Sequence, residues 1–220
     1  MFKLIMAALA AISIAEPVLS QELRGWKTFD SQGCMILREC TEDTWRVLET
    51  EDVEQRISYA DYGKVRTEAD ALLAELEKMG VEVYLAADRY FVRGVAGTYH
   101  TGENKFFLNV SYVDDPIQYI MTLRHEAWHA AQDAMAGTID NTFMAVIEDD
   151  SKIPQNIKLM VEIAYPESAR PWEQEAKWAG DVPGMTLEVL KVINETNGRP
   201  WTVLDPTPLT RLWLERNGYM

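Results

Sequence analysis

The stretch His125-Glu126-Ala127-Trp128-His129 has the pattern His-Glu-x-x-His. Two His that are four positions apart on a helix lie on the same face, about one turn from each other. A zinc ion can bind both imidazoles at that spacing, so we predict His125 and His129 as metal ligands. Glu126 points about 100° further round the helix, where it can deprotonate a zinc-bound water without binding the metal.

The segment around this stretch has the pattern of a helix. Asp114 or Asp115 can cap its first turn, Pro116 fits that turn, and apolar residues recur at helical spacing as far as Met135. Gly137 is a typical helix stop. We therefore predict a helix of about 20 residues. The alternative is a core helix whose two His fall four apart without binding a metal.

Residues 123–129, Leu-Arg-His-Glu-Ala-Trp-His, resemble the active-site helix of the zincin metallopeptidases. In the gluzincin group of that family, a Glu on a later helix completes the zinc site, in a pattern close to Glu-x-x-Ala. Glu173 and Ala176 show this pattern here. The resemblance implies Zn²⁺ as the cofactor, with Glu173 as the third ligand and Glu126 as the catalytic base. Lys177 stands where several relatives have an Asp that orients a His ligand, so the resemblance leaves that partner unassigned.

Glu175 is the alternative third ligand. Positions two apart on a helix point about 200° apart, so only one of Glu173 and Glu175 can face the metal. The Glu-x-x-Ala pattern favours Glu173, and the other carboxylate can then support a His from behind or face solvent. A further alternative is that both simply form an acidic first turn after Pro171.

Ahead of the His helix, we expect helices followed by strands. Residues 41–80 have a helical pattern, with a short segment from Thr41 or Asp43 to Leu48 and a longer one that Gly63 divides in two. Residues 81–85, 90–99 and 105–110 are rich in β-forming residues, and residues 101–104 are typical of a turn. We predict an α+β fold, mainly helical and zincin-like by resemblance, with a small antiparallel sheet ahead of the metal-binding helix.

Two features of these predicted strands bear on function. In zincins the strand that borders the cleft binds peptide by main-chain pairing. By that resemblance, Phe107 to Val110 is the candidate substrate edge, and an ordinary interior strand is the alternative. His100 lies in a turn-like setting, where a surface or hydrogen-bonded role is expected.

Three more helices are predicted after the His helix. They cover residues 156–164, between Pro154 and Pro166, residues 186–197, which Gly198 closes, and a last segment that Thr210 can cap. Trp128 is a candidate wall of the cleft. Four further tryptophans are expected to fill the core: Trp172, Trp178, Trp201 and Trp213.

Composition favours an ordinary globular chain. It has 220 residues, 47% of them hydrophobic, and a formal net charge of −14. That length fits one domain, and that charge disfavours nucleic acid and anionic membrane surfaces. Residues 1–20 have the pattern of a signal peptide: Lys3, an apolar run, and small residues before Gln21. We predict a secreted or periplasmic protein whose single domain covers residues 21–220, with no stable membrane insertion after cleavage.

The two cysteines agree with export. Cys34 and Cys40 lie close together, and in an oxidising compartment a disulfide is the simplest expectation. Free thiols or zinc ligands are the alternatives, but no nearby His or further Cys completes a site.

The sequence therefore predicts a zinc metallopeptidase acting on a peptide or protein substrate, with no prediction for its oligomeric state. Tyr99, His100 and Tyr165 are candidates for stabilising the oxyanion, and the sequence selects none of them. One alternative is an exported zinc-binding or zincin-like protein without peptidase activity. Another is a zinc hydrolase that acts on cell-wall peptides.

Overall fold

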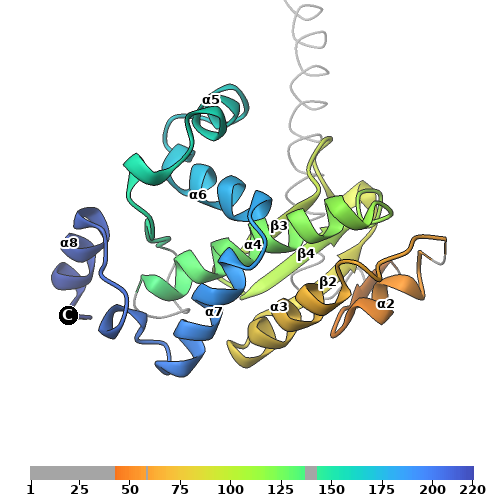
Figure 1. Cartoon of the computed structure of the whole chain (residues 1–220), viewed down its shortest axis with the longest axis horizontal. Helices are drawn as coiled ribbons and strands as arrows, with labels where there is room; N and C mark the ends of the chain where they lie inside the picture. The colour runs from red at the N-terminus through yellow and green to blue at the C-terminus, as the bar shows by residue number, and fades with distance from the viewer. Residues whose placement is uncertain (1–42, 58, 137–142) are drawn as a thin grey trace, which may run out of the picture.

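The computed structural model describes residues 43–57, 59–136 and 143–220 (Figure 1). The predicted signal peptide, residues 1–20, and the predicted Cys34–Cys40 disulfide lie outside these residues. The prediction of a mainly helical α+β fold is confirmed. The helices are α2 (Thr50–Glu54), α3 (Arg66–Lys78), α4 (Pro116–Met135), α5 (Gln155–Ala164), α6 (Arg170–Asp181), α7 (Met185–Glu195) and α8 (Pro208–Asn217). The strands are β1 (Thr44–Arg46), β2 (Glu82–Ala86), β3 (Gly97–His100) and β4 (Lys105–Asn109).

The four strands form one mixed sheet in the order β1-β2-β4-β3. The hairpin predicted around residues 101–104 is confirmed, because β3 and β4 pair antiparallel. β4 also pairs with β2, and this pairing is parallel, so the prediction of a wholly antiparallel sheet is wrong. The chain crosses from β2 to β3 before turning back along β4, and this crossover places β4 between the two earlier strands.

The same order corrects the predicted substrate edge. β4 pairs on both sides, so Phe107 lies in an interior strand. Both faces of β4 are also covered: Phe106 and Leu108 belong to the main hydrophobic cluster, whereas Phe107 packs with Tyr90 on the other side. In the described sheet, the edge strand next to β4 is β3.

The first described element is a strand where a short helix was predicted. Thr44–Arg46 pairs antiparallel with β2, and the N–H of Val47 continues the ladder by donating to Val83 O at 2.9 Å. Local apolar spacing favoured a helix here, but pairing with an existing strand satisfies the backbone groups of this short segment better. Of the two helices that Gly63 was predicted to separate, the second is confirmed as α3, and Gly80, at φ 79°, follows its end. The first is wrong in extent, because α2 ends at Glu54, well before Gly63.

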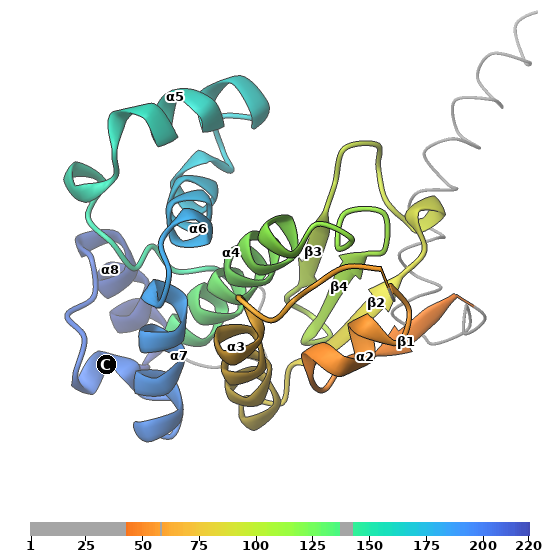
Figure 2. The ribbon, with the colours of Figure 1, turned by 45° about the vertical axis from the view of Figure 1, so that its right-hand side comes forward.

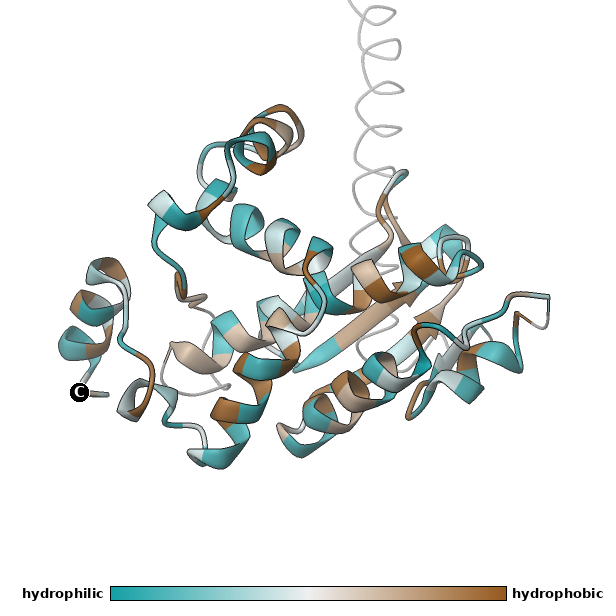
Figure 3. Ribbon diagram, in the orientation of Figure 1, coloured by the Kyte–Doolittle hydropathy of each residue, from teal (hydrophilic) through white to brown (hydrophobic). Residues whose placement is uncertain are grey.

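Helix α4 is the central element, packed between the sheet and the other helices (Figures 1 and 2). Its predicted start is confirmed, because the Asp115 side chain accepts a hydrogen bond from Ile117 N at 2.8 Å ahead of Pro116. Its apolar residues join the main cluster with α3, α7 and the sheet, whereas α6 covers a side of α4 that carries the two His. In Figure 3, hydrophobic bands mark α3 and α7, and the visible surface of α6 is mostly hydrophilic.

Helix α6 is held close to α4 by a glycine at the contact and by a hydrogen bond from Arg124, which an ion pair with Glu68 of α3 holds in place. A Cβ on Gly180 would lie 3.1 Å from Met121 O and 3.5 Å from the Cβ of His125, so a larger residue would push the two helices slightly apart. Arg124, which is buried, binds both carboxylate oxygens of Glu68 at 2.8 and 2.6 Å and donates to Gly180 O at 3.3 Å. These contacts fix the end of α6 against the middle of α4.

The predicted later helices are confirmed with small shifts. α5 lies between Pro154 and Pro166, and α7 ends before Gly198. α8 starts at Pro208 rather than at Thr210, whose buried hydroxyl instead accepts from Val146 N and donates to Val146 O, both at 3.0 Å.

The tryptophan predictions are wrong. Trp128 is fully buried, packs on Ala176 and Ala179, and forms no wall of a cleft. The four tryptophans expected in the core are only half-buried: Trp172, Trp178, Trp201 and Trp213. Within the described ranges, no helix is both long enough and apolar enough to cross a membrane.

Candidate metal centre

His125 and His129 lie one turn apart on α4, as their spacing predicts. Their ring centroids are 4.9 Å apart and the rings are nearly perpendicular, at 87°. His125 keeps 18% of its side chain exposed and lines a pocket, whereas His129 keeps 9% and is buried. The helix thus presents two imidazoles to one region of space.

Glu173 brings a carboxylate to the same region from α6. Its Oε2 lies 3.4 Å from Nε2 of His125, and its Oε1 lies 3.7 Å from Nε2 of His129. One ligand atom from each of the three residues can be chosen so that all lie within 4.8 Å of one another. The residues that the sequence predicted as the metal-binding set are therefore brought together.

The electrostatics of this cluster suit a cation. Burial alone would raise the pKa of Glu173, but hydrogen bonds and the charges of His129 and His125 outweigh it and hold the pKa well below its usual range. Burial would lower the pKa of His129, yet Glu173 and Glu126 raise it to about 9. Oε2 of Glu173 is buried, and its contact with Nε2 of His125, at 3.4 Å, lacks the geometry of a regular hydrogen bond, so a metal ion between the two would satisfy it.

Glu175, the alternative third ligand, is fully buried and faces Gln132 and Trp128 of α4 instead of the two His. Its carboxylate accepts four hydrogen bonds, from Gln132 Nε2 at 2.7 Å, Glu148 N at 2.6 Å, Ile147 N at 3.1 Å and Trp128 Nε1 at 3.3 Å. Burial raises its pKa to about 7, although the four donors oppose the shift. The structure thus brings Glu173, not Glu175, to the two His.

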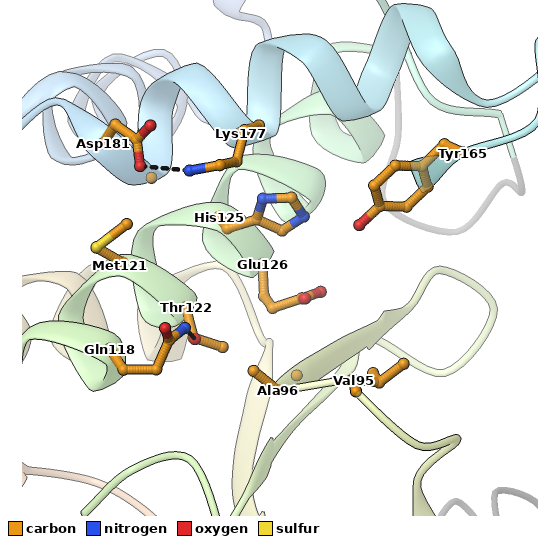
Figure 4. A pocket seen from close by; sticks show the side chains of 13 residues that line it. Val95, Ala96, Gln118, Met121, Thr122, His125, Glu126, Tyr165, Lys177 and Asp181 are labelled. Atoms are coloured by element: carbon orange, nitrogen blue, oxygen red, sulfur yellow. Dashed lines mark hydrogen bonds and ion pairs between the residues drawn. The ribbon is translucent and has the colours of Figure 1, made fainter. Parts of the chain in front are cut away.

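Glu126 is separate from the three candidate ligands and faces the pocket beside them (Figure 4). It is 7% exposed, and burial raises the pKa of its carboxyl, while His125, His129 and a hydrogen bond from the backbone N–H of Tyr99 oppose that rise. A Cβ on Gly97 would lie 2.9 Å from the Cγ of Glu126, so the strand can approach this side chain only with Gly there.

The pocket has a volume of about 370 Å³ and is open to solvent on one side. Residues 94–97 form one wall, and α4 and α6 form the others. Figure 4 shows Lys177 and Asp181 on α6 above His125, joined by an ion pair of 2.6 Å. A molecule that enters the pocket therefore meets His125, Glu126 and the chain leading into β3.

The three candidates for oxyanion stabilisation lie in different places. Tyr165, next to the end of α5, lines the pocket, and Figure 4 shows its hydroxyl pointing toward the side where His125 and Glu126 lie. Tyr99 instead donates to Asp133 Oδ2 at 2.7 Å. His100, at the far end of β3, does not line the pocket. Burial and the charges of Glu173 and Glu126 raise the pKa of Tyr165, so its hydroxyl keeps its proton at neutral pH.

One residue of the site was missed by the sequence analysis. Gln132 Oε1 lies 2.8 Å from Nδ1 of His129, whereas Lys177 pairs with Asp181. Gln132 is three positions after His129, on the same helix face, and that spacing was a usable signal.

No family model, curated protein or solved structure matches the chain. The likeness to gluzincins therefore stands on the residues of α4 and α6 alone.

Proposed function

We propose that this protein is a zinc-dependent metallopeptidase of gluzincin type. His125, His129 and Glu173 hold the zinc ion, and Glu126 acts as the general base. The observation that carries the proposal is the position of Glu126: it lies beside the three-residue cluster, on the pocket side, and is not one of the three. A structural zinc site would not require a buried carboxylate in that position.

The three side chains fit a catalytic zinc ion. Two imidazole nitrogens and one carboxylate oxygen are a common ligand set for catalytic zinc, which keeps a further position for water or substrate. In the described part of the chain, His125, His129 and Glu173 form the group of side chains that could hold a metal ion. Oε2 of Glu173 is buried and makes no regular hydrogen bond in the described residues, so a cation would satisfy it.

When bound, zinc lowers the pKa of water and polarises a carbonyl group. Glu126 accepts the proton of the attacking water and delivers it to the leaving amine. The raised pKa of Glu126 suits both roles, because a carboxylate with a higher proton affinity is a better base near neutral pH. Tyr165 donates its hydroxyl proton in a hydrogen bond to the oxygen on which charge develops.

The substrate is a peptide or protein segment in extended form. Residues 94–97 line the pocket and lead into β3, an edge strand, and an extended peptide can pair with such an edge. We therefore propose β3 as the substrate edge instead of Phe107 to Val110, which lie inside the sheet or beyond its end. The signal-peptide pattern at the N-terminus adds that the enzyme works outside the cytoplasm, in a secreted or periplasmic form.

The test is hydrolysis of unfolded protein and of a mixed peptide library by the purified chain. We expect cleavage that stops when a chelator removes the metal and returns when zinc is added. Glu126→Gln should bind zinc as the parent does but cleave nothing detectable. Activity on cell-wall peptide fragments alone would favour the alternative wall hydrolase, and zinc binding without hydrolysis of any of these substrates would contradict the proposal.

A further inference from the structure

The side-chain amide of Gln132 contacts a carboxylate, a backbone carbonyl and an imidazole. Its Nε2 lies 2.7 Å from Oε2 of Glu175 and 3.2 Å from the backbone carbonyl of Trp172. Its Oε1 lies 2.8 Å from Nδ1 of His129. Gln132 is fully buried, so water does not compete for these contacts.

These contacts decide which way the amide points. A carboxylate and a backbone carbonyl can only accept hydrogen bonds, so both must face the NH₂ group of Gln132. The carbonyl oxygen is then the only atom of the amide left for His129. Because that oxygen can only accept, Nδ1 of His129 must carry a hydrogen and donate it. In the neutral ring the other nitrogen, Nε2, then has its lone pair free, and this is the nitrogen that faces Glu173.

Glu175 cannot turn away from Gln132, because the rest of its carboxylate is held too. The backbone N–H groups of Ile147 and Glu148 and the indole N–H of Trp128 all donate to it. With Gln132 these make four donors, from α4 and from the segment that leads to α5, and Glu175 has no exposed surface. The carboxylate is therefore a fixed acceptor, not a mobile one.

We infer that Gln132 and Glu175 are positioning residues that set the tautomer and ring orientation of His129, so that its Nε2 lone pair is presented to the metal. This inference rests on the proposed function, since it concerns the same metal site. It gives Glu175 a defined role although it is not a ligand: it orients Gln132, and Gln132 orients His129. When a residue that orients a ligating His is replaced, metal affinity typically falls by about 10- to 100-fold.

The test measures zinc affinity, by competition with a chromogenic chelator, together with the nitrogen-bound ring protons of His129 in nuclear magnetic resonance spectra. In the zinc-loaded parent we expect a slowly exchanging Nδ1–H resonance for His129. Gln132→Met keeps the length and apolar stem of the side chain but removes the amide. It should weaken zinc binding about 10- to 100-fold and abolish or strongly shift that resonance.

Glu175→Gln is the second variant, for use if Gln132→Met does not fold. Its amide can no longer accept from all four donors, so the Gln132 amide loses its fixed direction and zinc affinity should fall in the same range. Leu190→Ala is the control for lost stability alone: it removes a buried apolar side chain of α7 that takes no part in these hydrogen bonds, and it should leave the Nδ1–H resonance in place.

The outcomes separate this inference from the proposed function. A parent that binds zinc, with Gln132→Met or Glu175→Gln within about twofold of its affinity and with an unchanged Nδ1–H resonance, would overturn the inference and leave the metal site standing. A parent that binds no zinc would overturn both.

Discussion

Oε2 of Glu173, on α6, lies 3.4 Å from Nε2 of His125, on α4. The two residues belong to different helices, and the distance exists because Gly180 lets α6 approach the backbone of α4 and Arg124 holds the end of α6 in place.

Glu126→Gln removes the proposed base and preserves the shape of the side chain. We expect the catalytic rate constant to fall by about 10²- to 10⁴-fold, the range of general acid–base catalysis. Zinc affinity should stay close to that of the parent, because Glu126 lies outside the ligand set. Steady-state hydrolysis and a chelator titration measure the two effects. A fully active Glu126→Gln variant would remove Glu126 from the mechanism.

Gly97→Ala tests how closely β3 must approach α4. The new Cβ would lie 2.7 Å from Cγ2 of Thr122 and 2.9 Å from Cγ of Glu126, too close for either to stay in place. We expect the free energy of unfolding to fall by about 1–3 kcal/mol. The rate of hydrolysis should fall by more than the loss of folded protein accounts for. Gly102→Ala is the matched control, because its Cβ would meet only ordinary contacts with His100. Equal activities for the two variants would contradict the account of the pocket wall.

Tyr165→Phe tests the proposed oxyanion donor. The ring and its packing remain, and only the hydroxyl that faces the pocket is lost. We expect the rate constant to fall by about 10²- to 10³-fold with zinc content unchanged. Tyr99→Phe is the comparison, since the hydroxyl of Tyr99 binds Asp133 rather than facing the pocket; it should affect stability more than turnover. If Tyr99→Phe lowered the rate constant more than Tyr165→Phe does, Tyr99 would be the oxyanion donor instead.

The stability of the metal-free protein should depend on pH through His129. Burial lowers the pKa of His129, but Glu173 and Glu126 raise it from 6.5 to about 9 in the folded chain. A raised pKa gives stability that is complete below the unfolded value and is lost as the pH rises through about 9. Between about pH 7.5 and about pH 9.5 the free energy of unfolding should fall by about 2 kcal/mol.

Urea denaturation of the chelator-treated protein at both pH values measures this loss. His129→Gln should show a much smaller difference between them, because the titrating group is gone. A metal-free parent that is equally stable at both pH values would show that Glu173 does not hold a proton on His129.

The helix that carries the motif could be predicted because its information is local. Asp115 as the cap, Pro116 in the first turn and the apolar spacing together define α4, and the spacing of His125 and His129 follows from the helix itself. Glu173 was predicted from a resemblance in pattern, since no local rule says which helix will pack beside α4.

What could not be predicted depends on contacts between distant segments. Thr44–Arg46 is a strand only because β2 is available to pair with it, and β4 is interior only because of the order in which the strands assemble. Gln132 stands at a helical spacing from His129 that the sequence displays. The direction of its amide, however, is set by Glu175 and by the carbonyl of Trp172, both on another helix.

The most direct test of the central claim is the zinc affinity of the purified parent beside Glu173→Ala and Glu175→Ala, with the exposed Glu188→Ala as control. We expect the parent and the control to bind about one zinc ion per chain with equal affinity. Glu175→Ala should bind about 10- to 100-fold more weakly, and Glu173→Ala more weakly still. A parent without zinc, or a Glu173→Ala variant with the affinity of the parent, would contradict the account.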